Sequence, residues 1–189
     1  MAKKGKLKKY QNNKFIKYTK INGLKISDNE AYIYLKVDNL DSIISEYSFS
    51  DNYILKQDFL DTIEKCASFI PLEYPLVLEI ENNTFTSEEK IRIRKLIRDH
   101  FSLQTITKEE ELKADHRESR LFLLFGITCF IISWGIYDIE KFSFINEITL
   151  FIASFSVWES FSNIVFEEDE LKEEIEQYKS LSKIRVIYK

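Results

Sequence analysis

The segment LFLLFGITCFIISWGIY, residues 121–137, decides how the rest of the sequence is interpreted. It is a run of seventeen residues without a charged side chain, at the lower edge of the roughly 17 to 25 residues that an α-helix needs to cross a bilayer. Trp134 and Tyr137 lie at its end, and both residue types favour the headgroup region. The run has no polar face, whereas a helix of a soluble protein usually keeps one. We therefore predict a membrane-spanning helix.

A second apolar run follows at residues 148–166. Its nineteen residues contain one charged side chain, Glu159. Ten residues, 138–147, separate the two runs and suffice for a tight connection, so the pair predicts a transmembrane hairpin over residues 121–166. The alternative is a pair of buried helices in a soluble core, because four serines lower the hydropathy of the second run: Ser154, Ser156, Ser160 and Ser162.

Basic residues near the span ends predict the orientation of the hairpin, because cytoplasmic flanks carry more lysine and arginine. Lys113, Arg117 and Arg120 precede the first span, whereas the tip holds only Lys141. We therefore expect the tip to face outward. Both chain termini should then lie in the cytoplasm, where the segments on either side of the hairpin can pack together.

The remaining sequence predicts a cytoplasmic α+β domain assembled from both sides of the hairpin, residues 26–115 with residues 167–189. Segments rich in Val, Ile, Leu and Tyr favour strands. They occur at residues 31–37, 75–81 and 183–189, with weaker candidates at residues 15–19 and 103–107. We expect the last strand to join the sheet formed by the earlier ones.

Helical patterns alternate with these strands. Apolar residues recur at helical spacing over residues 39–49 and 55–70. Thr86 followed by Glu89 is a capping box, so a helix should begin at Ser87. After the hairpin, seven acidic residues fall within residues 167–176, and Leu171, Ile175 and Tyr178 form one apolar stripe. Uninterrupted helical patterns over residues 109–137 and 148–180 predict that each span continues as a helix into the soluble domain.

The first 25 residues form a basic segment with nine lysines and no acidic residue. With aromatic residues among the lysines, this composition is typical of surfaces that neutralise phosphates and stack bases. It equally suits a polybasic segment attracted to anionic lipid, or a solvated tail. The helix after Thr86 adds cations on one face, with Arg92 and Lys95 near its edges; that face is either a phosphate-binding surface or a solvated one. The candidate ligand-binding residues are Lys3, Lys4, Lys6, Lys8, Lys9, Tyr10, Lys14, Lys17, Lys90, Arg94 and Arg98.

Small residues recur at helical spacing in both spans. Gly126, Cys129 and Ser133 give the first span a face that another helix can approach closely, and we assign them to helix packing. The second span carries a matching stripe of small or polar residues: Thr149, Ala153, Ser156, Ser160 and Asn163. One such stripe can pack within the hairpin. Polar surface left over would have to meet water or another subunit, and we assign Ser156, Glu159, Ser160 and Asn163 to a pore or inter-subunit surface.

Two interpretations of Glu159 stay open. A carboxylate near the centre of the hydrocarbon costs on the order of 2.5 kcal/mol or more, and usually faces a bundle interior or a water-filled cavity. Glu159 precedes Phe166 by seven residues, about 10 Å from the cytoplasmic end at ~1.5 Å per residue. It is therefore either a pore-lining or inter-subunit residue, or an interfacial carboxylate that reaches toward the headgroups.

The sequence offers no pattern typical of an enzyme, and we predict no catalytic residue. It has no glycine-rich phosphate loop and no recognisable nucleophile and base. His100 and His116 lie among charged residues of predicted helices, and Cys66 and Cys129 lack metal-ligand spacing. We therefore expect no cofactor, no bound metal and no disulfide.

The order of motifs resembles a known group of proteins. The motifs are PLVLEIENNTFTSEEKIRIRKLIRDHF (residues 75–101), RESRLFLLFG (117–126), VWESFSNIVFEE (157–168) and YKSLSKIRVIY (178–188). Over about residues 74–189, this order resembles small bacterial membrane proteins with two spans. These are similar to the membrane effectors of anti-phage systems of the Hailong type, in which a nucleotidyltransferase makes an oligonucleotide signal. The resemblance implies an oligomeric channel of the bacterial inner membrane that binds a DNA oligomer and depolarises the host on opening.

The sequence thus leads to one main hypothesis and one main alternative. We expect a homo-oligomeric ion channel, with a tetramer as the first guess, gated by single-stranded DNA or another anionic nucleotide signal made by a nucleotidyltransferase encoded alongside. Two spans of one chain cannot enclose an aqueous pore, so conduction demands several copies. The alternative is a non-conducting membrane anchor or scaffold for a cytoplasmic partner.

Overall fold

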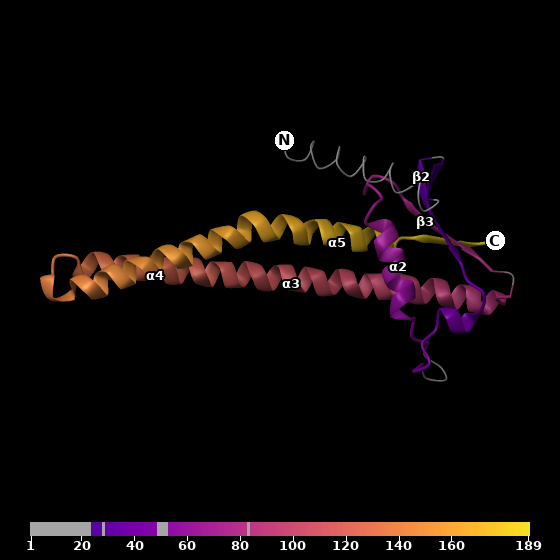
Figure 1. Ribbon diagram of the computed structural model, residues 1–189, viewed down its shortest axis with the longest axis horizontal. Helices are drawn as coiled ribbons and strands as arrows, with labels where there is room; N and C mark the ends of the chain where they lie inside the picture. The colour runs from indigo at the N-terminus through magenta and orange to yellow at the C-terminus, as the bar shows by residue number, and fades with distance from the viewer. Residues whose placement is uncertain (1–23, 28, 49–52, 83) are drawn as a thin grey trace. The chain divides into compact units, whose positions relative to one another are not determined.

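The computed structural model describes residues 24–27, 29–48, 53–82 and 84–189 (Figure 1). The chain divides into two compact units. The sheet unit comprises Met1–Thr105 and Glu176–Lys189, and the hairpin unit comprises Ile106–Ile175. Segments from both sides of the hairpin therefore belong to one unit.

A four-stranded mixed sheet organises the first unit, in the spatial order β1-β2-β3-β4. Its strands are β1 (Lys25–Ser27), β2 (Glu30–Lys36), β3 (Leu76–Glu81) and β4 (Arg185–Tyr188). β1 pairs antiparallel with β2, whereas β2–β3 and β3–β4 are parallel pairs. The predicted strands at residues 31–37, 75–81 and 183–189 are confirmed, and the last one does join the sheet. The weaker candidate at residues 15–19 lies outside the described residues.

One face of the sheet packs against helices. Ile33 of β2 lies beside Leu78 of β3, which lies beside Val186 of β4, and all three are buried. The helix α2 (Gln57–Ala67) contributes Leu60 and Ile63 to the same core, and α3 (Ser87–Ile136) contributes three fully buried residues, Ile93, Ile97 and Phe101. Their spacing of four residues places them along one side of α3. The core therefore fixes which faces of α3 stay open to solvent.

The capping box at the start of α3 is confirmed. The backbone N–H of Thr86 donates to the carboxylate of Glu89 at 2.7 Å, and the N–H of Glu89 donates to the hydroxyl of Thr86 at 3.2 Å. The helix begins at Ser87, as predicted. The strand candidate at residues 103–107 is wrong, because α3 continues through it to Ile136. Thr105 bonds its hydroxyl to the carbonyl of Phe101 within the helix, so its β-branched side chain is accommodated there.

The helix predicted over residues 39–49 is also wrong. Within the described part of this segment, residues 39–48, the helical structure is limited to a 3₁₀ turn, η1 (Leu40–Ser42), with Asn39 accepting a bond from the N–H of Ser42 at 3.0 Å. The chain then forms a bridge between Ile44 and Leu55. That bridge satisfies backbone groups that a helix would have used internally, so a contact distant in sequence overrides the local periodicity. The helix predicted over residues 55–70 is confirmed as α2.

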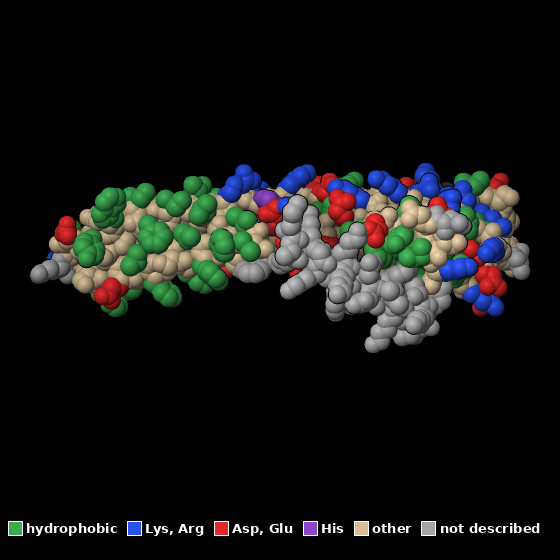
Figure 2. Space-filling view, turned by 90° about the horizontal axis from the view of Figure 1, so that it is seen from above, with side chains coloured by type: hydrophobic (Ala, Val, Ile, Leu, Met, Phe, Trp, Pro, Cys, Tyr) green, Lys and Arg blue, Asp and Glu red, His purple; other side chains and the backbone are tan. Residues whose placement is uncertain are grey.

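The hairpin unit consists of the later turns of α3 and a returning helix in three parts. These are α4 (Ser143–Ser162), a π-helical stretch η3 (Asn163–Glu167) and α5 (Glu168–Ser182). The last turns of α5 belong to the sheet unit. The short helix η2 (Glu140–Phe142) forms the tip between α3 and α4. α3 and α4 run side by side in Figure 1. α3 and the helix from Ser143 to Ser182 are each long and apolar enough to cross a membrane, and only 17% of the apolar stretch of each is buried. Figure 2 shows hydrophobic side chains spread over the surface of this hairpin.

Candidate functional site

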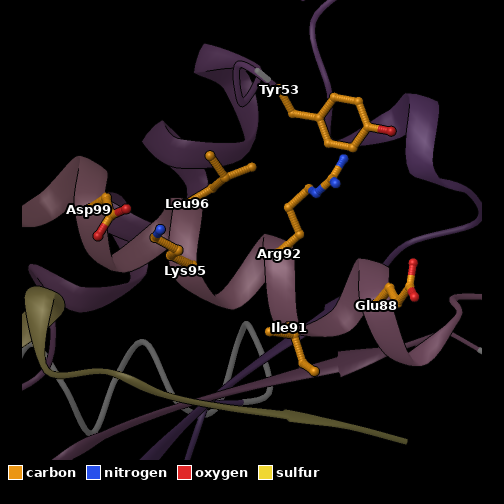
Figure 3. A pocket seen from close by; sticks show the side chains of 7 residues that line it. All are labelled: Tyr53, Glu88, Ile91, Arg92, Lys95, Leu96 and Asp99. Carbon is orange, nitrogen blue, oxygen red and sulfur yellow. The ribbon is translucent and has the colours of Figure 1, made fainter. Parts of the chain in front are cut away.

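A pocket lies on the solvent-facing side of the first turns of α3. Its volume is about 520 Å³, within the usual range for small-molecule sites. Six of its residues come from α3. Their spacing of three and four residues places them on one face of the helix. Tyr53, from the segment before α2, supplies the facing wall (Figure 3). The lining residues are Tyr53, Glu88, Ile91, Arg92, Lys95, Leu96 and Asp99.

Arg92 is the cation held most firmly in this pocket. Its guanidinium carbon lies 4.7 Å from the centre of the Tyr53 ring, and Figure 3 shows the side chain directed toward that ring. A guanidinium stacked on an aromatic face keeps N–H groups at its edge available for a phosphate or carboxylate. Lys95 lies three residues on, so the two cations are neighbours on the helix. Glu88 and Asp99 flank them along α3, which limits the space for an anionic group to the centre of the pocket.

The cationic face predicted from the sequence lies elsewhere on α3, against β4. Arg98 donates its Nε–H to the carbonyl of Ile184 at 3.1 Å. The ammonium of Lys90 lies 5.4 Å from the centre of the Tyr188 ring, whose hydroxyl donates to the carbonyl of Lys90. Burial raises the pKa of Tyr188 to about 12, opposed by the charge of Arg94. Lys90 and Arg98 therefore hold β4 in place, and Arg94 lies within electrostatic reach of it.

Arg92 and Lys95, which the sequence places at the edges of that face, are the cations that line the pocket. Their carboxylate neighbours could have been found from the spacing of residues 88, 92, 95 and 99 on one helix face. Tyr53 carries no such signal, since it reaches α3 only through tertiary structure. The basic candidates Lys3, Lys4, Lys6, Lys8, Lys9, Tyr10, Lys14 and Lys17 lie outside the described residues.

Small residues line the contact between α3 and α4. A methyl group added at Gly126 would lie 2.8 Å from Cγ2 of Val157 and 3.0 Å from the carbonyl oxygen of Ala153. Cys129 and Ser133 are buried as well, and the hydroxyl of Ser133 donates to the side-chain oxygen of Asn146 on α4. The structure thus brings the small face of the first apolar run against the second.

The four residues assigned to a pore or inter-subunit surface have different environments. Ser156 and Ser160 are buried, and the hydroxyl of Ser156 bonds the carbonyl of Ile152 in its own helix at 2.8 Å. Glu159 and Asn163 are partly exposed. The backbone N–H of Asn163 donates to the carbonyls of both Glu159 and Ser160, where the α-helix widens into η3. π-helical turns of this kind are frequent at functional sites.

Ion pairs connect α3 and α5 within the hairpin unit. Lys108 donates to Glu174 at 2.9 Å and to Glu111 at 3.0 Å, and these bonds raise the pKa of Lys108 above its ordinary value. His116 lies 3.8 Å from Glu168. A hydrogen bond from Lys172 is the main cause that lowers the pKa of Glu168. The described residues contain no group of three His, Cys, Asp or Glu side chains that could hold a metal ion.

No protein-family model, curated protein or solved structure matches this chain.

Proposed function

We propose that this chain is a two-span protein of the bacterial inner membrane, with both termini in the cytoplasm, that assembles into an ion channel responding to an anionic nucleotide or DNA oligomer. The observation that carries the proposal is the surface of the hairpin. Large apolar side chains cover it while small residues fill its interior, an arrangement stable in lipid and costly in water. A buried helix pair in a soluble core would hide most of this surface, so the exposed fraction favours the membrane.

The pocket at Tyr53, Arg92 and Lys95 is where we propose that the anionic ligand binds. Two neighbouring cations can hold one phosphate group, and the tyrosine fixes one of them in orientation. Because Glu88 and Asp99 flank the cations, a compact phosphate suits the centre better than a broad polyanionic surface. The lysines of residues 1–25 would then supply longer-range attraction for an oligomer.

α3 supports a path from ligand to membrane. It is one helix from Ser87 to Ile136, and its first turns line the pocket while its last turns pack against α4. A ligand shifts an equilibrium between closed and open assemblies only by its differential affinity for the two. Because α3 belongs to both the pocket and the span, a movement of this helix would change the affinity of the pocket for the ligand and the state of the channel together.

A non-conducting anchor is the second candidate, and specific bonds favour it. The exposed hydroxyls of Thr128, Thr149 and Ser154 each bond the carbonyl four residues earlier in their own helix, at 2.8, 2.8 and 2.9 Å. Polar groups satisfied in this way tolerate lipid. With Ser156 and Ser160 buried, Glu159 and Asn163 are the pore candidates left with partly exposed side chains.

Electrical recording from purified protein in planar bilayers tests the proposal. We expect discrete currents that short DNA oligomers on the cytoplasmic side alter, and a changed unit conductance in Glu159→Gln. Replacing both pocket cations (Arg92→Gln, Lys95→Gln) should abolish the response to DNA, while Lys65→Gln on α2 serves as the matched control. Silent bilayers with inserted protein, under every oligomer tried, would establish the anchor instead.

A further inference from the structure

A basic stripe on α3 lies immediately before the first apolar run. Lys113, Arg117 and Arg120 are exposed, and their spacing of four and three residues places them on one helix face. Arg120 donates its Nε–H to the carbonyl of His116 at 3.0 Å. Among the described residues, Lys113 and Arg117 have no ion-pair partner, in contrast to Lys108, which is bonded to Glu111 and Glu174.

An acidic surface lies at the same level on α5. The contacts Lys108–Glu174 and His116–Glu168 show that α3 and α5 run antiparallel in this unit, so the level of Lys113 corresponds to that of Asp169 and Glu170. Both acids are exposed, and within the described part of the chain neither forms an ion pair. The acids of α5 that meet α3, Glu168 and Glu174, are already used.

One chain therefore carries a basic patch on α3 and an acidic patch on α5 at the same height along the hairpin, and the described residues of the two patches form no ion pair with each other. We propose that Lys113 and Arg117 of one copy pair with Asp169 and Glu170 of the next copy around the membrane assembly. The inference rests on the oligomer of the proposed function and adds the contact that builds it. The two patches differ from each other, so the contact is heterologous, and repeating it generates a closed ring when the rotation closes. A ring is the symmetry that a central pore requires.

The position of the stripe favours this pairing. It stands at the end of a lipid-facing surface, where a neighbouring copy excludes water and weakens screening of the charges. Arginine can bond a carboxylate through two parallel N–H groups, which fixes geometry as well as sign. Anionic lipid headgroups offer the competing explanation for the cations, but they would leave Asp169 and Glu170 without a role.

Charge reversal in two separate full-length chains tests the pairing. One chain carries Lys113→Glu and Arg117→Glu, so that both of its patches are acidic. The other carries Asp169→Lys and Glu170→Lys, so that both of its patches are basic. The oligomer is quantified by native mass spectrometry in lipid nanodiscs, for each chain alone and for the differently tagged chains expressed together. Lys36→Glu with Lys65→Glu, on the exposed surface of the sheet unit, is the matched control.

Each reversed chain alone should lose about tenfold or more of its oligomer, because like charges then meet at every contact. Co-expression should restore assembly, since each acidic patch then finds a basic one on the other chain. Recovery in the mixture cannot arise from contacts within one chain, and it shows that both variants fold. The control should assemble like the wild type.

Three results would overturn the pairing. The first is undiminished assembly of both reversed chains, and the second is failure of the mixture to recover. The third is a loss confined to the first chain and dependent on anionic lipid, which would assign the stripe to headgroups. All three leave the wild-type oligomer intact. A wild type that is monomeric would instead refute the oligomeric channel itself, so the two failures are distinguishable.

Discussion

The sheet unit and the hairpin unit place the same residue types in opposite positions. In the sheet unit Phe101 is 0% exposed, and charged side chains cover the outside. In the hairpin unit Ser160 is 1% exposed whereas Phe151 is 73% exposed. In water, burial of large apolar side chains stabilises the fold. Lipid is as apolar as leucine, so in a membrane close backbone approach and hydrogen bonding determine which residues pack between helices. The difference is the one expected if water surrounds the sheet unit and lipid surrounds the hairpin unit, as we propose.

The largest difference in stability is expected when one phenylalanine in each unit is replaced by alanine. Phe101→Ala should destabilise the sheet unit by about 3–5 kcal/mol, because a cavity replaces a fully buried ring. Phe151→Ala on α4 should change stability by less than about 0.5 kcal/mol. Thermal unfolding of the purified protein in detergent measures both. Equal losses for the two variants would contradict the outward-facing position of Phe151 on the hairpin.

A larger side chain at the contact between α3 and α4 tests the close packing inside the hairpin. Gly126→Leu should destabilise the hairpin by about 1–3 kcal/mol, because its side chain meets backbone and side-chain atoms of α4. Gly135→Leu is the control, since nothing lies within 4 Å of a Cβ there. Cross-linking between cysteines placed on α3 and α4 reports the separation. A hairpin that tolerates leucine equally at both glycines would exclude the tight contact.

A capping variant tests a contribution that belongs to the water-facing unit. Hydrogen bonds from Thr86 lower the pKa of Glu89 below its ordinary value of 4.5. The capping contribution is therefore present above the unfolded-state pKa and is lost as pH falls through the lower folded-state pKa. Glu89→Ala should cost about 1 kcal/mol near neutral pH.

The difference between Glu89→Ala and the wild type should shrink as the pH is lowered below 4.5, measured by thermal unfolding over an acid series. Glu88→Ala is the control, one residue from the capping position. A difference that stays constant with pH would exclude the carboxylate as its source.

The smallest effect is expected inside the hairpin. Ser133→Ala removes the hydroxyl that donates to Asn146, and hydrogen bonds between membrane helices average about 0.6 kcal/mol. Ser154→Ala removes a hydroxyl bonded only within its own helix and should change less. Unfolding of the helices in mixed micelles resolves the two. A larger loss for Ser154→Ala would show that polar groups on the outer surface matter more than those in the contact.

Local signals account for the parts of the fold that were predicted correctly. Thr86 and Glu89 cap one another within a single turn, so the start of α3 was visible in four residues. The first apolar run has no polar face, and both runs form long apolar helices. The terminal strand was recognisable from the composition of residues 183–189, because three of its four residues are β-branched or aromatic.

The errors arose where partners distant in sequence decide the structure. Ile43 and Ile44 fit a helical period, but the 3₁₀ turn ends at Ser42 and Ile44 pairs with Leu55 in a bridge. The sequence does not predict the pocket: it places Arg92 and Lys95 only near the edges of a cationic face and gives no signal for Tyr53. The function of Lys90 and Arg98 as contacts for β4 was not visible either, since the sequence gives no measure of where that strand packs.

The parallel pairing of β3 with β4 places a constraint on biosynthesis. Leu181, Ile184 and Val186, all buried in the core of the sheet unit, leave the ribosome after both apolar runs. Roughly a hundred residues separate β3 from β4, which takes on the order of 5–20 s to translate. During that interval one edge of β3 lacks the strand that pairs with it in the finished sheet. The sheet unit is thus completed last, after the whole hairpin has been translated.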